Sequence, residues 1–262
     1  MSPLDVRLMN ALTAALLLAF AAMALGLALH HLARQPAFTL QKIQIDNELV
    51  HNNAVTLRAN VAPKLAGNFF TVDLEQAKSA FEAVPWVRQA VVRREFPNRL
   101  RVQLQEHQAV ALWGLDDDVR LINHLGEVFE VNQGDVEPES LPRLAGPRVQ
   151  SALVLQAYRE LGPLFAGLDT ELSLLELTGR GGWRARLEGG AMIEGGAMIE
   201  IGPGSVQDIV QRVRRFVATV SQTSSRFGRN IESADLRYPN GYALRLRGVT
   251  TVDGDRASKT TR

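Results

Sequence analysis

Three kinds of hydrophobic pattern follow one another along the chain. An uncharged run from Ala11 to Leu29 comes first, and its only polar side chain is Thr13. Short alternating stretches and helical stripes then occupy residues 38–107, and a second series of them extends to about residue 248. The polar residues 249–262 predict a disordered tail. The chain is therefore expected to hold one apolar segment, two folded domains and a tail.

The apolar run is long enough to cross a membrane. As a helix, its 19 residues would measure about 28 Å, close to the hydrocarbon thickness of a bilayer. A cleaved signal peptide has a shorter apolar core, of about 7–15 residues, and its small-residue cleavage pattern is poorly placed here. We expect a retained transmembrane helix over residues 11–32, a cytoplasmic tail over residues 1–10 and a linker over residues 33–37. The few flanking charges do not fix the orientation.

Residues 38–107 show the pattern of a compact β-α-α-β-β domain. Asn53 and Asp73 each precede a helical stripe and can cap it, and Pro85 ends the second helix. Leu100, Val102 and Leu104 alternate with Arg and Gln, which indicates a strand. The predicted strands lie around residues 43–45, at residues 87–95 and at residues 100–105.

Residues 108–248 predict a mixed β domain with packed helices, so the fold class is α+β. Ser205 precedes a long amphipathic stripe, and Pro239-Asn240-Gly241 predicts a hairpin turn near the end. The last strand places Tyr242, Leu244 and Leu246 on one face and Ala243, Arg245 and Arg247 on the other. Strands are predicted at residues 109–113, 120–123, 128–131, 172–177, 183–187, 234–238 and 242–247, and helices at residues 149–168 and from Ser205 to Val220.

One hexapeptide is duplicated in tandem. Glu188–Ile193 reads EGGAMI and is repeated at once as Glu194–Ile199. The period is far too short for a repeat architecture, so we expect an insertion at a hairpin tip. Six is an even number, so the insertion keeps the inside–outside alternation of the following strand, whereas a five-residue change would invert it.

Composition excludes several classes of function. The net charge of +1 argues against a nucleic-acid binder, and the absence of cysteine excludes disulfides and thiolate metal sites. The five histidines show no metal-ligand spacing, Asp116–Asp118 lacks the pattern of a calcium loop, and Gly202–Ser205 lacks the lysine of a phosphate-binding loop. We find no set of nucleophile, base and orienting group. We therefore expect no catalytic residues, no metal and no cofactor.

An ordered set of short motifs runs through both predicted domains. In residues 38–107 the motifs are Gly67-Asn68-Phe69-Phe70-Thr71-Val72-Asp73-Leu74, Pro85-Trp86-Val87, Arg93-Arg94, Phe96-Pro97, Arg99-Leu100 and Glu106-His107. Further motifs follow in Leu121-Ile122-Asn123, Gly126-Glu127-Val128-Phe129, Leu141-Pro142, Gly146-Pro147, Arg215-Phe216 and Asp235–Gly241. Each motif alone is weak, but the ordered set over residues 11–248 resembles the FtsQ (DivIB) family of cell-division proteins. Residues 38–107 resemble the polypeptide-transport-associated (POTRA) domain of that family.

The resemblance implies a function and a location. It implies a single-pass type II protein of the inner membrane, with its bulk in the periplasm at the division septum. It also implies a scaffold that binds FtsB and FtsL, contacts other division proteins through the POTRA domain and acts upstream of septal peptidoglycan synthesis.

The resemblance further implies partner binding by β-strand addition at the last strand. A proline at Ala243 or Arg245 is then expected to block the partner strand. The partner-binding residues matched to the family are Arg180, Arg237, Tyr238, Asn240, Gly241, Tyr242, Leu244, Arg245 and Arg247.

Other classes of protein remain open from the residues alone. An outer-membrane transporter with POTRA domains would need a tract of barrel strands, which is missing. A membrane-anchored hydrolase would need a catalytic set. A secreted adaptor would need signal cleavage. A membrane-anchored periplasmic POTRA adaptor or chaperone outside cell division is the main alternative.

Overall fold

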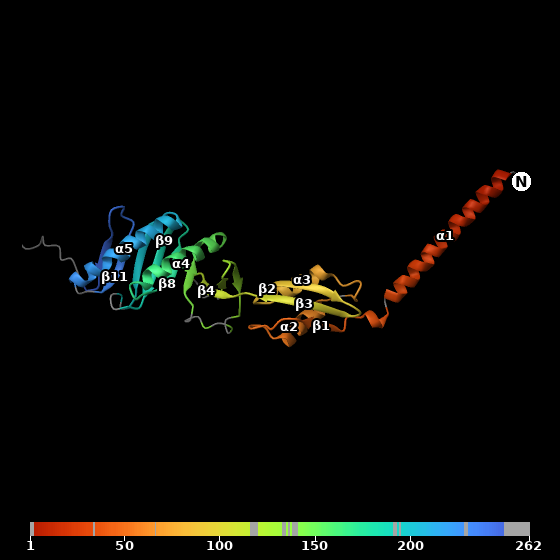
Figure 1. The fold of residues 1–262 in the computed structure, drawn as a ribbon, viewed down its shortest axis with the longest axis horizontal. Helices are drawn as coiled ribbons and strands as arrows, with labels where there is room; N and C mark the ends of the chain where they lie inside the picture. Colours follow the sequence, from red (N-terminus) through yellow and green to blue (C-terminus); the bar gives the residue numbers. More distant parts are fainter. Residues whose placement is uncertain are drawn as a thin grey trace, which may run out of the picture. The chain divides into compact units, whose positions relative to one another are not determined.

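The computed structural model describes residues 3–33, 35–65, 67–115, 120–132, 135, 137, 141–190, 193, 195–227 and 230–248. The chain divides into two compact units, Met1–His107 and Gln108–Arg262, and each is described by itself (Figure 1). The predicted tail at 249–262 and the acidic run at 116–118 lie outside the described residues.

The first helix is longer than predicted. Helix α1 spans Pro3–Ala33, so most of the expected tail is helical. Proline is favoured in the first turn of a helix, and the residues that follow it contain neither glycine nor a second proline before Gly26. The predicted linker is also partly ordered, because Pro36–Phe38 form the short 3-10 helix η1. Within α1, Met9–Ala28 has a mean hydropathy of 2.3, and by length and composition it could cross a membrane.

The rest of the first unit has the predicted β-α-α-β-β order. Strand β3 lies in the middle of a three-stranded sheet, parallel to β1 and antiparallel to β2. The side chains of Asn53 and Asp73 accept hydrogen bonds from the first turns of α2 and α3, as predicted. The elements are β1 (Lys42–Ile45), α2 (Ala54–Val61), η2 (Ala62–Lys64), α3 (Leu74–Glu82), β2 (Val87–Glu95) and β3 (Arg99–Glu106). The core contains Leu57, Val61, Ala80, Phe81, Val87, Ala90, Val102 and Leu104.

A carboxylate fixes the loop between β1 and α2. Glu106 ends β3, and its two oxygens accept hydrogen bonds from the backbone N–H groups of Val50, His51 and Asn52. The His51 ring stacks on Trp86 with 3.7 Å between centroids. Val50 stays 86% exposed. The loop is therefore ordered and presents an apolar side chain to solvent.

The second unit is built on one nine-stranded mixed sheet. Its strand order is β12-β11-β10-β9-β8-β7-β4-β5-β6. Strand β7 was not predicted, because three residues are too few to show a pattern. The elements are β4 (Ala109–Trp113), β5 (Arg120–Asn123), β6 (Val128–Glu130), β7 (Arg143–Ala145), η5 (Arg148–Gln150), α4 (Ser151–Ala166), β8 (Glu171–Leu177), β9 (Gly182–Glu188), β10 (Ala197–Pro203), α5 (Val206–Phe227), β11 (Ile231–Asp235) and β12 (Ala243–Leu246).

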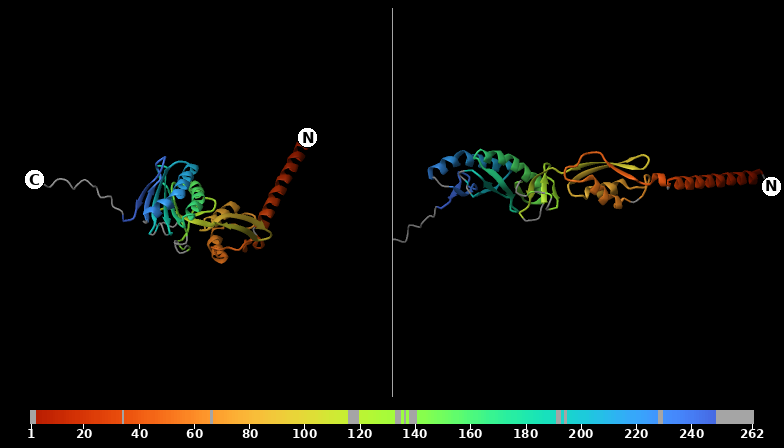
Figure 2. Two further views of the ribbon diagram at one scale, coloured as in Figure 1. Left: turned by 60° about the vertical axis from the view of Figure 1, so that its left-hand side comes forward. Right: turned by 90° about the horizontal axis from the view of Figure 1, so that it is seen from below.

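Two helices cover one face of this sheet. Helices α4 and α5 pack against each other and against β8 and β10 respectively (Figures 1 and 2). Ser205 caps α5 as predicted, because its hydroxyl accepts from the Asp208 N–H and donates to the Asp208 carboxylate. On the open face of the sheet, the guanidinium of Arg184 on β9 forms an ion pair of 2.8 Å with Glu200 on β10.

The last hairpin differs from its prediction. Strand β11 ends at Asp235 and β12 begins at Ala243, so Tyr238 and Tyr242 lie outside the strands. The backbone N–H of Arg237 donates to the side chain of Asp235 at 3.0 Å, which turns the chain out of the strand early. The connection is a loop of seven residues rather than a tight Asn-Gly turn.

The duplicated hexapeptide lies between β9 and β10. The second copy supplies the start of β10, where Ala197 and Ile199 are buried. Of the first copy, Glu188 ends β9, and Ile193 is fully buried in the core. The insertion therefore contributes to packing and is not only a loop extension.

Candidate partner-binding edge

Strand β12 is the last strand of the sheet among the described residues. The Arg247 N–H donates to the Asn230 carbonyl at 2.8 Å, toward β11. In an antiparallel pair, alternate residues direct their backbone groups to the same neighbour. Ala243 and Arg245 therefore also face β11, whereas Leu244 and Leu246 direct their N–H and C=O groups to the open edge.

The side chains of this edge region are divided between core and solvent. The ring of Tyr242 packs edge-on against Phe216 with 5.2 Å between centroids, and its hydroxyl lies 2.8 Å from that of Thr219. Leu244 also packs on the core. The side chains of Tyr242 and Leu244 thus anchor the strand in the core. A partner strand can use the outward N–H and C=O groups of Leu244 but not these two side chains.

Two arginines lie on the exposed side of the chain here, Arg245 within β12 and Arg247 directly after it. Arg245 and Arg247 are exposed, as predicted. Arg247 Nη2 lies 3.5 Å from the Gly196 carbonyl, and a Cβ added at Gly195 would meet the same guanidinium at about 3.1 Å. The second copy of the hexapeptide is therefore in contact with a predicted partner-binding residue.

Arg237 is held by Asp235, which opens the same family motif and had been assigned no role from the sequence. Its Nη2 lies 2.6 Å from the Asp235 carboxylate, and its Nε donates to the same group at 2.9 Å. These hydrogen bonds from the Arg237 guanidinium lower the pKa of the Asp235 carboxyl below its usual range. Gly202 has a φ of +89°, and a Cβ there would approach Arg237 Cγ to 2.7 Å. The Asp-x-Arg spacing could have indicated the pair, but the glycine contact depends on the fold.

The loop before β12 presents the remaining predicted residues. Tyr238 is 56% exposed, and Asn240 and Gly241 are also exposed. Arg215 on α5 supports the loop by donating to the Pro239 carbonyl at 2.9 Å. Asn240 and Gly241 also line a cavity of about 360 Å³, together with Arg212, Arg215, Ala218, Thr219, Leu236 and Tyr242.

The structure brings Arg180 to the same end of the sheet as this loop. Arg180 is exposed in the turn between β8 and β9, and Gly182 beside it pairs with Pro203 at the end of β10. Strand β11 runs parallel to β10 and ends at the same end. Neighbouring strands are about 4.8 Å apart, so the turn and the loop are separated by roughly 10 Å across the sheet. One extended partner could contact both.

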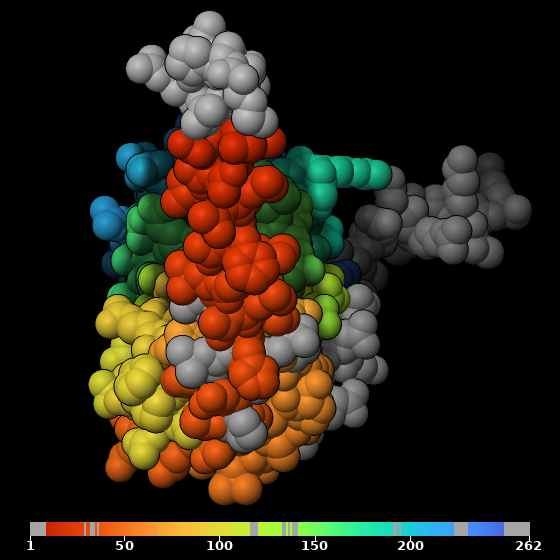
Figure 3. Space-filling model, turned by 90° about the vertical axis from the view of Figure 1, so that its right-hand side faces the viewer, coloured from red at the N-terminus to blue at the C-terminus, as the bar shows by residue number. Residues whose placement is uncertain are grey.

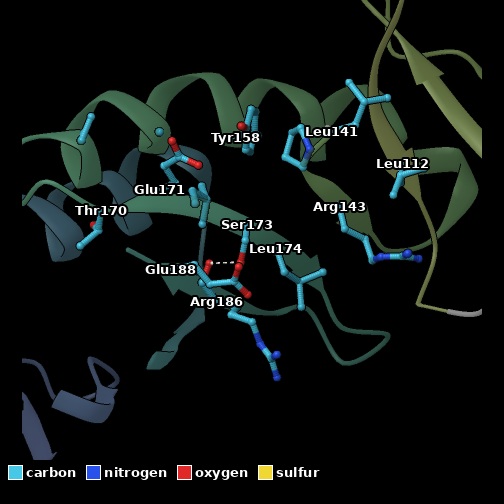
Figure 4. A pocket seen from close by; sticks show the side chains of 14 residues that line it. Leu112, Leu141, Arg143, Tyr158, Thr170, Glu171, Ser173, Leu174, Arg186 and Glu188 are labelled. Atoms are coloured by element: carbon cyan, nitrogen blue, oxygen red, sulfur yellow. Dashed lines mark hydrogen bonds between the residues drawn. The ribbon is translucent and has the colours of Figure 1, made fainter. Parts of the chain in front are cut away.

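A second cavity, of about 560 Å³, lies beside α4 and β8 (Figure 4). Ser173 donates to the Arg186 carbonyl at 3.2 Å. Burial, with a smaller contribution from Glu171, raises the pKa of the Tyr158 hydroxyl. The Tyr158 hydroxyl is thus held protonated and is not poised as a base at neutral pH. Over the described ranges, no three His, Asp or Glu side chains cluster in a way that could hold a metal ion.

Comparisons with known proteins give the same division of the chain. Residues 38–107 match the family described as "POTRA domain, FtsQ-type", and residues 111–237 match "Cell division protein FtsQ/DivIB, C-terminal". A protein of Burkholderia pseudomallei named "Cell division protein FtsQ" is 39% identical over 95% of both chains. A protein of the same name from Bordetella pertussis is 40% identical over 92% of both chains. Another, from Thiomonas arsenitoxydans, is 36% identical over 99% of this chain and 94% of the relative.

Proposed function

This chain belongs to the FtsQ/DivIB family of cell-division proteins, and we propose that it is a non-enzymatic scaffold anchored in the inner membrane at the division septum. Family membership gives it a role in bacterial division, and its apolar N-terminal helix suggests membrane anchoring. In the proposed topology, type II, α1 spans the membrane and residues 35–262 lie in the periplasm. The scaffold links early to late assembly and acts upstream of septal peptidoglycan synthesis.

The proposed partners are FtsB and FtsL, bound by strand addition at β12. The observation that carries this is the position of β12 at the end of the sheet, with the backbone groups of Leu244 and Leu246 directed outward. A partner strand would hydrogen-bond to these groups. Arg245 and Arg247 supply positive charge at the edge, and Arg180 supplies it at the end of the sheet where the loop before β12 lies, so an acidic partner segment is favoured. The POTRA domain would contact other division proteins.

Cysteine crosslinking tests the strand addition directly. The chain has no natural cysteine, so single cysteines at Ala243, Arg245 and Arg247 are unique. If FtsB adds a strand, each position crosslinks to one FtsB position, and successive pairs step by two residues along both strands. Non-reducing gels of the full-length proteins would show this ladder. Crosslinks without a common register would refute strand addition.

Proline substitution at Ala243 or Arg245 does not isolate this mechanism. Both residues direct their backbone toward β11, so proline there disrupts the native pairing as well as a partner strand. Tyr238→Ala is the cleaner change because the side chain is exposed and outside the strands. We expect it to weaken FtsB binding by about 2 kcal/mol, as for an aromatic interface anchor. Val149→Ala, at an exposed residue before α4, is the matched control.

The main alternative is an anchored POTRA adaptor or chaperone outside division. Depleting the protein from its host separates the two functions. A division scaffold predicts long filaments without septa, whereas normal septation during depletion would favour the alternative.

A further inference from the structure

Four phenylalanines from three separate segments form one cluster on the POTRA domain. Phe38 follows α1, Phe69 and Phe70 precede α3, and Phe96 lies in the turn between β2 and β3. The centroids of Phe38 and Phe70 are 4.9 Å apart, those of Phe69 and Phe70 5.2 Å, those of Phe69 and Phe96 5.9 Å and those of Phe38 and Phe96 6.3 Å. The rings thus form a closed group, which we call the phenylalanine cluster.

The cluster is exposed. Phe96 is 71% accessible and Phe70 is 50% accessible, while Phe38 and Phe69 are half-buried. None of the four belongs to the hydrophobic core of the POTRA domain. Moving large aromatic rings out of water is favourable. An exposed group of them therefore indicates a surface that meets an apolar partner.

Backbone hydrogen bonds tie the cluster to the start of the domain. The Phe69 N–H donates to the Phe38 carbonyl at 2.8 Å, and the Gln41 N–H donates to the Asn98 carbonyl at 3.1 Å. In Figure 3, the yellow atoms of the β2–β3 region lie beside the orange-red atoms of the segment that follows α1. Wherever the chain places Phe38, the other three rings must follow.

The chain keeps Phe38 near the membrane surface. The apolar stretch ends at Ala28, and α1 continues to Ala33, which adds about 7 Å of helix. The five residues from there to Phe38 reach at most roughly 17 Å further. The polar layer of a bilayer is about 5–8 Å thick on each side, so the cluster lies within reach of it.

The charges around the cluster favour anionic headgroups. Lys42, Arg94 and Arg99 are exposed, and Lys42 pairs with Arg99 at the same end of the sheet as Phe96. The acidic neighbour Glu95 has one oxygen 3.4 Å from Arg101. Aromatic side chains with basic neighbours are typical of surfaces that lie in the interface of a membrane.

We propose that the phenylalanine cluster inserts into the headgroup region of the membrane that α1 spans and holds the POTRA domain against it. This inference rests on the membrane anchoring proposed above. The rings supply apolar contact, and the basic side chains supply attraction to anionic lipid.

Tryptophan reporters in single-copy nanodiscs test the proposal with the full chain. The lipid is phosphatidylethanolamine with about one quarter phosphatidylglycerol, with and without brominated acyl chains, because anionic lipid contributes to binding. The variants are Phe70→Trp, Phe96→Trp and, as matched control, Val50→Trp. Val50 is also exposed and apolar, but it lies at the other end of β1 and β3. The natural tryptophans Trp86, Trp113 and Trp183 are buried and give the same background in every variant.

Membrane insertion predicts that bromine quenches both phenylalanine-site reporters about twofold more than the Val50→Trp reporter. Equal quenching of all three reporters would indicate general adhesion of the domain to the membrane. No quenching at Phe70 and Phe96 would indicate that the cluster binds a protein partner instead. Either result overturns the proposal. Flotation with vesicles separates the two hypotheses. A chain that does not float refutes the anchor and this inference together, whereas a floating chain with unquenched reporters refutes this inference alone.

Discussion

At the scale of single residues, the loop before β12 is controlled by the pair of Asp235 and Arg237. The carboxylate accepts from both the backbone and the guanidinium of Arg237, which ends β11 and leaves Tyr238 exposed. Sequence reasoning selected Arg237 and Tyr238 through a resemblance to the family. It quoted Asp235 in the same motif but assigned it no role, because a carboxylate two residues from an arginine is common on surfaces and gains a role only when the fold brings both to a turn.

The same pair predicts a small pH dependence of stability. The pKa of Asp235 is lowered in the folded state, so its contribution is present above the unfolded value of about 3.9 and is lost as pH falls through the folded value. Asp235→Asn should reduce the loss of unfolding free energy between pH 5 and pH 3 by less than about 1 kcal/mol, because Arg237 is largely exposed. Urea midpoints across this range measure the effect. Glu232→Gln, which removes another carboxylate from the same strand, is the control.

At the scale of elements, the duplicated hexapeptide joins β9 to β10 and also enters the core. Leu187 pairs with Ala197, so nine residues separate the paired positions. Removing six leaves Glu188-Gly189-Gly190, a three-residue connection of a kind that hairpins commonly use. The register can therefore survive the deletion, but the burial of Ile193 cannot.

Deleting Glu194–Ile199 should lower the unfolding free energy by about 1–4 kcal/mol. Loss of a buried isoleucine costs about 2–5 kcal/mol, and the shorter loop returns roughly 1 kcal/mol of closure entropy. Urea unfolding of the full chain in detergent measures this, with Ile193→Ala as the matched single change.

A five-residue deletion, Glu194–Met198, should be more damaging. It places a methionine where Ala197 is now buried, which adds about 1–3 kcal/mol of overpacking. A six-residue deletion as stable as the wild type would contradict the packing role of Ile193. Equal effects of the two deletions would contradict the register argument.

Most elements could be predicted because their periodicity is strong. Strand β3 alternates without interruption, and the caps Asn53, Asp73 and Ser205 mark helix starts by local hydrogen bonds that depend on neighbouring residues alone. Strand β7 could not be predicted, because it has only three residues and is defined by its pairing with β4 and β8. The direction of the backbone groups in β12 could not be predicted either, because it depends on the pairing with β11.

At the scale of the whole molecule, the proposed topology places one apolar helix before two folded units. The orientation of the helix in the membrane decides which compartment holds those units, and the flanking charges do not determine this orientation. A periplasm-only reporter fused after Arg262 should be active in cells, and a cytoplasm-only reporter at the same place should be silent. The reverse pattern would exclude the type II arrangement, and activity of both would indicate mixed insertion.

The repeat also offers β10 two beginnings of identical sequence. Ala191–Glu194 and Ala197–Glu200 have the same sequence, AMIE, yet the second copy occupies the strand. The second copy is selected because it runs directly into Ile201 and Gly202 of the same strand. The first copy could replace it in the strand only if six residues bulged out before Ile201. A slip of the first copy into the strand would also empty the buried site that Ile193 now fills. A damaging substitution at Ile199 is therefore not relieved by its duplicate, and the two copies hold the register of β10 although their sequences are the same.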